Sequence, residues 1–184
     1  AGSFENDKTD NSYFLFKTGK INWLVLNLEF GPRNAVLNWA NDIVSKHPGH
    51  LVIVNTHSYM YSDSTRQGPG DSWRPQAYGV GKDKGDSSVN DGEQVWEKLV
   101  RKHPNIRFVF SGHVLNSGVG TLVSINDEGH PVYQMLANYQ EGVKGSVHGG
   151  NGWLRILDMD FKKKTVRVRT YSPFIKQYMQ DPAH

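Results

Sequence analysis

The sequence predicts an α/β fold with a layered core. Two observations support this prediction. Up to about residue 113, apolar strand-like runs alternate with segments of helical period, and after about residue 119 only strand-like runs follow. The 184 residues suit one domain or part of a larger one. With 37% hydrophobic residues, the chain has enough apolar material for a folded core.

A β-hairpin is predicted near the N-terminus. Residues 1–11 are polar and predict a loose N-terminal segment ahead of a main domain at residues 12–174. Two apolar runs at residues 13–16 and 21–28 flank a turn that contains glycine, which is the pattern of a hairpin. The second run is almost continuously apolar, as in a strand that is buried on both faces.

The middle of the chain predicts two helix–strand units separated by a long loop. Asn34 is a plausible N-cap for a helix that Pro48 ends, and a short buried strand follows at residues 51–54. Residues 58–90 have no periodicity but contain several aromatic residues, which favours an ordered functional loop. A second helix begins at Asp91, and a strand follows at residues 106–110.

The last third of the chain predicts strands only, followed by a C-terminal tail at residues 175–184. The predicted strands cover residues 120–124, 132–137, 153–159 and 165–170.

Composition excludes several classes of protein. The chain has no cysteine, so disulfide frameworks, thiolate catalysis and cysteine-bound metals are excluded. The net charge of +3 comes without a basic tract, and the densest basic cluster, at residues 162–169, is interpreted as a turn and the solvent face of a strand. No nucleic-acid groove is therefore predicted. No apolar run approaches the ~18 residues of a membrane span, and no signal-peptide pattern opens the chain.

Two of the eight histidines stand out by their position. His57 and His113 each lie just past the C-terminal end of a predicted buried strand. Ligands bind outside the carboxyl ends of strands in layered α/β folds, and two imidazoles on one rim suit a divalent transition metal. The other six histidines are interpreted as ordinary surface or loop residues.

A serine esterase is the main competing interpretation from the residues alone. Ser72 and Ser87 both follow Gly-Asp, and Asp181 and His184 have the Asp-x-x-His spacing of some esterases. A serine nucleophile normally follows a buried strand, however, and both serines lie in the long loop. Chance Gly-Asp-Ser triplets account for them better. The glycines at 149–152 have no strand–helix context, so a turn is a better interpretation than a phosphate loop.

These histidine turns and their surroundings resemble the calcineurin-like metallophosphoesterases, in particular one bacterial branch of that superfamily. The resemblance covers about residues 12–174. It rests on an ordered set of motifs: Leu28–Arg33, Asn55–His57, Val89–Gly92, Phe110–His113, Gln134–Gln140, Gly149–Arg155 and Thr170–Pro173.

The resemblance implies a layered β-sandwich of two sheets with flanking helices, of the metallophosphoesterase type, and a two-metal site at the strand ends. Such a site hydrolyses a phosphomonoester or phosphodiester by means of a metal-bound hydroxide. His57 takes the place of the family's isolated histidine ligand, and His113 that of the first histidine in Gly-His-x-His; both would bind one Mn, Fe or Zn ion. No catalytic residue is assigned beyond these ligands.

The sequence departs from the family pattern in two ways. The second histidine of Gly-His-x-His falls on Leu115, which cannot bind a metal. The family's earlier motifs, Asp-x-His, Gly-Asp-x-x-Asp and Gly-Asn-His-Asp/Glu, are absent. The chain therefore resembles the C-terminal half of such an enzyme. It is expected to bind metal weakly by itself, and to expose an apolar face that an N-terminal half or a second copy would cover.

Five further residues are predicted to contact substrate. Tyr59, Tyr61 and Trp73 in the long loop could shape a pocket beside His57, and loop packing is an equally good explanation. Asn138 and Tyr139 end a predicted strand and could point polar groups at the site, although turn residues look the same. The alternative function is a non-catalytic module whose aromatic loop contacts carbohydrate or protein. The resemblance also favours, weakly, an extracellular or periplasmic protein.

Overall fold

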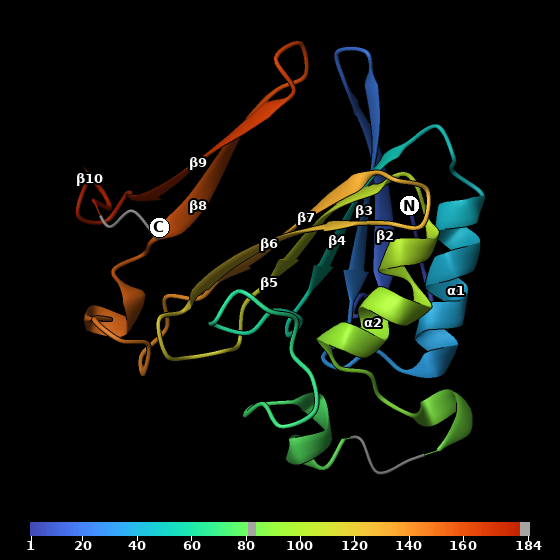
Figure 1. The fold of residues 1–184 in the computed structure, drawn as a ribbon, viewed down its shortest axis with the longest axis horizontal. Helices are drawn as coiled ribbons and strands as arrows, with labels where there is room; N and C mark the ends of the chain where they lie inside the picture. The colour runs from blue at the N-terminus through green and yellow to red at the C-terminus, as the bar shows by residue number, and fades with distance from the viewer. Residues whose placement is uncertain (81–83, 181–184) are drawn as a thin grey trace.

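The protein is a mixed α/β molecule with one large sheet, one small sheet and few helices (Figure 1). A computed structural model describes residues 1–80 and 84–180. The large sheet has the strand order β1-β2-β3-β4-β5-β7-β6. Its strands are β1 (Gly2–Ser3), β2 (Ser12–Thr18), β3 (Ile21–Leu28), β4 (Leu51–Thr56), β5 (Ile106–Ser111), β6 (Val119–Ile125) and β7 (Pro131–Ala137).

The centre of the large sheet is parallel and its two edges are antiparallel. Strands β3, β4, β5 and β7 pair in parallel, whereas β2 pairs antiparallel with β3, and β6 with β7. The predicted hairpin is confirmed by the register from Ser12↔Asn27 to Thr18↔Ile21. Parallel strands align their carboxyl ends, so the segments that follow β4 and β5 leave the sheet at one rim.

The α-helices lie together on one face of the large sheet (Figure 1). Within the described residues they are α1 (Asn34–Ser45) and α2 (Gly92–Lys98), and short 3₁₀ helices lie at Pro75–Tyr78, Gly85–Ser87, Val100–Lys102 and His148–Gly150. The apolar side chains of α1 and α2 pack with those of β3, β4 and β5 into one core. Asn34 is the first helical residue, not the predicted N-cap, which is Arg33. The Asn34 side chain instead donates to the Gly85 carbonyl.

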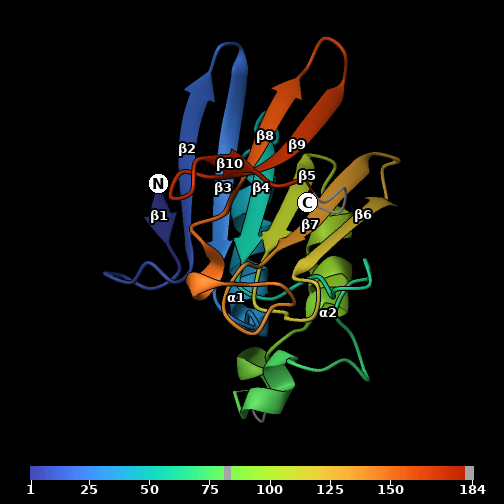
Figure 2. The same ribbon diagram turned by 90° about the vertical axis from the view of Figure 1, so that its left-hand side faces the viewer.

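The small sheet lies on the side of the large sheet away from the helices (Figures 1 and 2). It has the order β10-β9-β8, with β8 (Leu154–Asp160), β9 (Thr165–Ser172) and β10 (Gln177–Tyr178). A turn at residues 161–164 joins β8 to β9, as predicted for the basic cluster. Strand β10 gives part of the predicted tail a regular structure.

The N-terminal segment corrects one prediction. Residues 1–11 are not loose, because β1 pairs with β2 and Phe4 packs edge-on against Trp39 of α1, with 5.9 Å between ring centroids. Asn11 is 3% exposed, and its side chain both donates to Glu29 and accepts from the Glu29 backbone. Although the segment is mostly polar, the Phe4 ring and the Asn11 amide together hold it in place.

The face of the large sheet opposite the helices is partly open. Phe14 and Phe16 of β2 are 49% and 45% exposed, and Phe161 in the β8–β9 turn is 49% exposed. Two hollows lie between the sheets, of about 550 and 540 Å³. These phenylalanine side chains lie toward the start of β4, away from His57 and His113, because Phe16 pairs with Trp23 and Trp23 with Leu51. That a further segment or a second copy covers an apolar face stays a prediction.

Candidate functional site

The two predicted histidines meet at the rim where β4 and β5 end. β4 ends at Thr56, directly before His57, and β5 ends at Ser111, two residues before His113. The two loops are joined by a hydrogen bond from the Gly112 backbone N–H to the His57 carbonyl, 3.1 Å long. His113 adopts a left-handed backbone conformation with φ of 66°, which turns its ring back toward His57.

The imidazole rings face each other through one nitrogen each. His113 Nδ1 lies 3.0 Å from His57 Nε2, and the ring centroids are 4.7 Å apart. The rings of Phe30 and Tyr78 enclose the pair: Phe30 lies 5.5 Å from His57 and 4.9 Å from His113, and Tyr78 lies 5.2 Å from His113. The facing nitrogens thus lie beside an aromatic wall.

The other nitrogen of His113 fixes the tautomer of the ring. Nε2 lies 3.2 Å from the Trp73 carbonyl, which can only accept, so Nε2 carries the proton and Nδ1 presents a lone pair. Burial lowers the pKa of His113, nearby His57 lowers it further, and the hydrogen bond to Trp73 opposes them. The neutral imidazole that results is the form that binds a metal.

This geometry fits two ligands of one transition metal. With metal–nitrogen bonds of about 2.0–2.1 Å, two nitrogens on one ion lie about 2.9–3.4 Å apart for angles between 90° and tetrahedral. The observed 3.0 Å, which is a hydrogen bond between the two rings in this structure, also falls in that range. A histidine ligand also usually donates its second N–H to a carbonyl or carboxylate, as His113 does to Trp73.

The rest of a metal site is missing from the part of the chain that the structure describes. It contains no group of three or more His, Asp or Glu side chains that could hold an ion. Leu115 lies near this rim, where the family pattern has its third histidine, and it lines a different hollow. Two nitrogen ligands give no negative charge to favour a cation, so metal binding by these residues alone should be weak.

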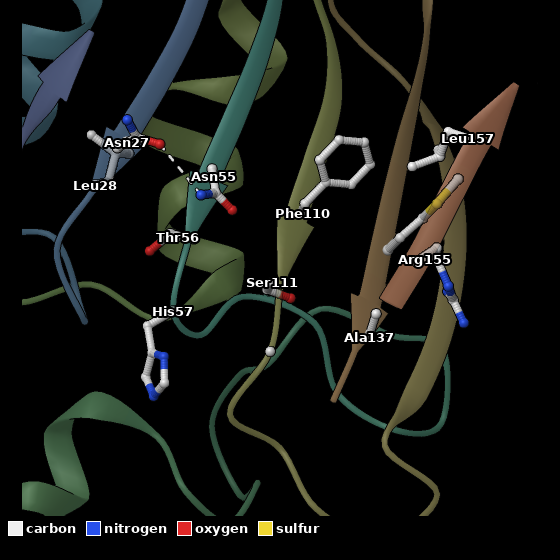
Figure 3. Close-up of a pocket in the computed structure, with 12 residues that line it drawn as sticks. Asn27, Leu28, Asn55, Thr56, His57, Phe110, Ser111, Ala137, Arg155 and Leu157 are labelled. Atoms are coloured by element: carbon white, nitrogen blue, oxygen red, sulfur yellow. Dashed lines mark hydrogen bonds between the residues drawn. The ribbon is translucent and has the colours of Figure 1, made fainter. Parts of the chain in front are cut away.

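A hollow of about 550 Å³ runs from His57 between the two sheets (Figure 3). Asn27 and Asn55 lie on its large-sheet wall, 3.3 Å apart through their side chains, and Phe110 lies beside them. Arg155 of β8 lies on the opposite wall. No acidic side chain lines this hollow among the described residues, so its polar groups favour an anionic occupant.

Arg155 is a half-buried cation on this wall. Its Nη1 donates to the Leu136 carbonyl at 3.3 Å, and its Nε and Nη2 atoms are buried without a hydrogen-bond partner among the described residues. An unpaired buried donor costs free energy, and more so when it is charged.

The five predicted substrate residues have separate environments. Tyr59 is fully buried, its hydroxyl donates to Gln134 at 2.7 Å, and burial raises its pKa well above the usual value, which all fits the packing alternative. Tyr61 packs against Trp73, with ring centroids 6.2 Å apart. Trp73 touches His113 through its carbonyl. Of the five, Trp73 thus lies nearest the histidine pair.

The described contacts of Asn138 and Tyr139 are with other segments of this chain. The Asn138 side chain donates to the Val114 carbonyl at 3.0 Å and accepts from the Gln140 backbone, which orders the segment after His113. The Tyr139 hydroxyl lies 3.1 Å from Thr170 of β9 and so joins the two sheets. Their predicted contacts with substrate stay predictions.

Sequence reasoning missed several residues of this rim. Phe30, Tyr78, Asn27, Asn55 and Arg155 were not proposed as site residues. Asparagines near the carboxyl ends of two mostly apolar strands are a signal that could have found Asn27 and Asn55. Nothing local marks Arg155, because its position opposite His57 depends on how the small sheet packs.

A half-buried ion pair supports the turn after β3. Glu29 accepts from Arg33 through both carboxylate oxygens, at 2.7 and 3.0 Å. Burial acts to raise the pKa of Glu29, but the hydrogen bonds from Arg33 and Asn11 outweigh it and hold the pKa below its usual value. The pair orders the turn that carries Phe30 toward the histidines, within the motif Leu28–Arg33.

The serine esterase interpretation gains no support from the described residues. Ser72 and Ser87 are exposed, and neither hydroxyl is hydrogen-bonded to a histidine among the residues described. The Asp71 carboxylate instead accepts from the Gly68 backbone at 2.7 Å, as in an ordinary turn. Asp181 and His184 lie outside the described residues.

Comparison with known proteins leaves the family open. No protein-family model matches the chain, and no solved structure matches it. A curated relative, the uncharacterized protein YvnB of Bacillus subtilis, is 28% identical over 180 residues, which is 95% of this chain. The chain spans about 12% of the length of that relative. No helix in the described ranges is long and apolar enough to cross a membrane.

Proposed function

We propose that this chain is part of a metal-dependent phosphoesterase and supplies two ligands of its metal site. The observation that carries the proposal is the spacing of His57 Nε2 and His113 Nδ1, 3.0 Å, with the second His113 nitrogen bonded to a carbonyl. The motif order that resembles the calcineurin-like metallophosphoesterases supports the same function.

The chain's own residues have definite tasks in this proposal. His57 and His113 hold a Mn, Fe or Zn ion, and Trp73 fixes the His113 ring through its carbonyl. When bound, the metal supplies Lewis acidity and activates water for attack on phosphorus. Phe30 and Tyr78 exclude water from one side of the pair. The substrate is a phosphomonoester or phosphodiester.

The remaining ligands are proposed to come from the preceding segment of a longer polypeptide or from a second copy of the chain. The hollow that runs from His57 between the two sheets supports this, because it offers an unfilled surface beside the histidine pair.

A non-catalytic module is the second candidate. The observations in its favour are Leu115 in place of a ligand, and the lack of any three-ligand cluster among the residues described. In that case the aromatic loop would act as a contact surface and the histidine pair would have no catalytic task.

The test is metal-dependent hydrolysis by the natural polypeptide that contains this chain. Bis(4-nitrophenyl) phosphate and 4-nitrophenyl phosphate are the substrates, with Mn²⁺ or Zn²⁺ added or removed by a chelator. The phosphoesterase proposal predicts activity that the chelator abolishes and that His57→Ala and His113→Ala each lower by about 10²-fold or more. His130→Ala, at an exposed histidine, is the matched control.

Two other results would redirect the proposal. Binding of metal without hydrolysis of either substrate would favour the non-catalytic module. Hydrolysis of a carboxylic ester that resists chelators and is blocked by a fluorophosphonate would favour the serine esterase.

A further inference from the structure

A third hollow lies on the side of the histidine pair where Trp73 is. It has a volume of about 630 Å³ and opens to solvent. Its lining includes Ser62, Trp73, Leu115, Asn116, Ser117 and Lys144. Trp73 joins it to the histidines, because the Trp73 carbonyl accepts from His113. Trp73 thus belongs both to this hollow and to the surroundings of the histidine pair.

The hollow combines one aromatic wall with hydrogen-bonding groups. The Trp73 ring is supported by Tyr61, whose plane is tilted from it by 33°. The Asn116 amide is oriented by its donation to the Ser62 hydroxyl at 3.0 Å, which leaves Asn116 Oδ1 as an acceptor. Within the described residues, Asn116 Oδ1 and Lys144 Nζ have no hydrogen-bond partner. The hollow thus offers a free acceptor, a free cationic donor and an aromatic surface.

This set of groups suits a ring that carries hydroxyls. An aromatic side chain packs against the C–H face of such a ring, while amide, hydroxyl and ammonium groups bind the hydroxyls at its edge. An acyl chain would instead need a mostly apolar lining. We propose that this hollow binds the sugar or cyclic polyol portion of the phosphoester substrate. The inference rests on the proposed function for the position of the phosphoryl group, but binding itself requires no hydrolysis.

Saturation-transfer NMR on the metal-free natural polypeptide tests the proposal. The probes are glucose 1-phosphate, ribose 5-phosphate and myo-inositol 1-phosphate, with glycerol 3-phosphate and inorganic phosphate as acyclic comparators. The ring protons of at least one cyclic probe should receive saturation, and that probe should bind more tightly than glycerol 3-phosphate. Because the protein is free of metal, failure to hydrolyse phosphoesters would leave this result intact.

Three variants locate the site. Trp73→Asn removes the indole but suits the left-handed backbone at φ 59° and keeps the carbonyl, and it should weaken binding about tenfold. Lys144→Gln, at an exposed side chain, should weaken binding several-fold without affecting folding. Phe174→Asn removes an aromatic ring that is 72% exposed elsewhere, and should change nothing.

Three results would overturn the proposal. These are no saturation of ring protons with any cyclic probe, equal affinity for glycerol 3-phosphate, or unchanged affinity in both Trp73→Asn and Lys144→Gln. If circular dichroism shows that Trp73→Asn does not fold, the result for Lys144→Gln decides alone.

Discussion

At the scale of single residues, strand ends predicted the histidine pair but not its hydrogen bonds. His57 and His113 were singled out because each follows a buried strand, and the structure brings their nitrogens to 3.0 Å. The Trp73 carbonyl that orients His113 is 40 residues away in the chain, so no local pattern could reveal it. Tyr59 shows a second limit of prediction from sequence. An aromatic residue in a loop gives the same sequence signal whether its side chain faces a ligand or the core, and Tyr59 is in the core.

His103 predicts how the free energy of unfolding depends on pH. It is half-buried, and its Nε2 lies 2.8 Å from Asn41 Oδ1, which accepts. Burial, with a smaller contribution from the charge of Lys102, lowers the pKa of His103 below 6.5. Below pH 6.5 the unfolded chain therefore binds more protons than the folded one. The contribution of His103 should be flat above pH 6.5 and should destabilise the fold progressively as the pH falls.

Urea unfolding between pH 5 and 8 checks this contribution. His103→Gln keeps an N–H donor for Asn41 but does not titrate, so its loss of stability on acidification should be smaller than that of the wild type. Identical pH profiles for the two proteins would contradict the assignment.

Among the helices and strands, the long segments with a hydrophobic period were predictable from the sequence, whereas the two-residue strands were not. Strands β2 to β9 and both helices follow hydrophobic patterns, and Asp91 begins α2 as predicted. The two-residue strands β1 and β10 depend on pairing with a neighbour and have no period of their own. The α1 start shifted by one residue because the Asn34 side chain bonds to the long loop.

Asp91 predicts a large effect at the start of α2. Its side chain is 1% exposed, accepts from the Gln94 backbone at 3.1 Å, and pairs with Arg74 at 2.6 Å. Asp91→Ala should lower the free energy of unfolding by about 2 kcal/mol or more, because it removes a cap and leaves Arg74 unpaired. Asp91→Asn keeps the cap, so its loss should be smaller. Glu97→Ala, at an exposed ion pair, should stay within about 0.5 kcal/mol.

Gly92 predicts a steric effect one residue later. A Cβ at Gly92 would lie 1.9 Å from the Tyr59 carbonyl oxygen, which is backbone and cannot move alone. Gly92→Ala should therefore cost about 3 kcal/mol, at the upper end of overpacking effects. Gly49 is the matched control, since a Cβ there meets nothing within 4 Å. Thermal unfolding of both variants gives the comparison, and equal midpoints would contradict the packing described for α2.

For the whole molecule, the presence of helix and sheet layers was predictable from the sequence, but the order of the strands in the large sheet was not. Alternation of strands and helices predicted an α/β core, and the later run of strands predicted further sheet. Neither pattern shows that β7 joins the parallel centre while β6 forms an edge, because that order depends on which strand pairs across a long connection. An open apolar face was predicted because the chain lacks the family's earlier motifs. The exposed phenylalanines are consistent with that prediction.

The open face predicts dye binding by the isolated chain. The 184-residue chain should bind the apolar dye ANS through the surface around Phe14, Phe16 and Phe161, and extension of the chain by its natural preceding residues should suppress that binding. Phe14→Lys should lower dye binding with little change in stability, because Phe14 is 49% exposed. Phe174→Lys should leave it unchanged. Equal dye binding by the short and extended chains would show that the added residues do not cover this face.

Elemental mass spectrometry of the natural polypeptide, after dialysis against Mn²⁺ or Zn²⁺, shows whether the histidine pair binds metal. Wild type and His130→Ala should contain one or more ions per chain, and His57→Ala and His113→Ala should each lose metal. Absence of bound metal in the wild type, or equal metal content in all four proteins, would contradict the assignment of the histidine pair as a metal site.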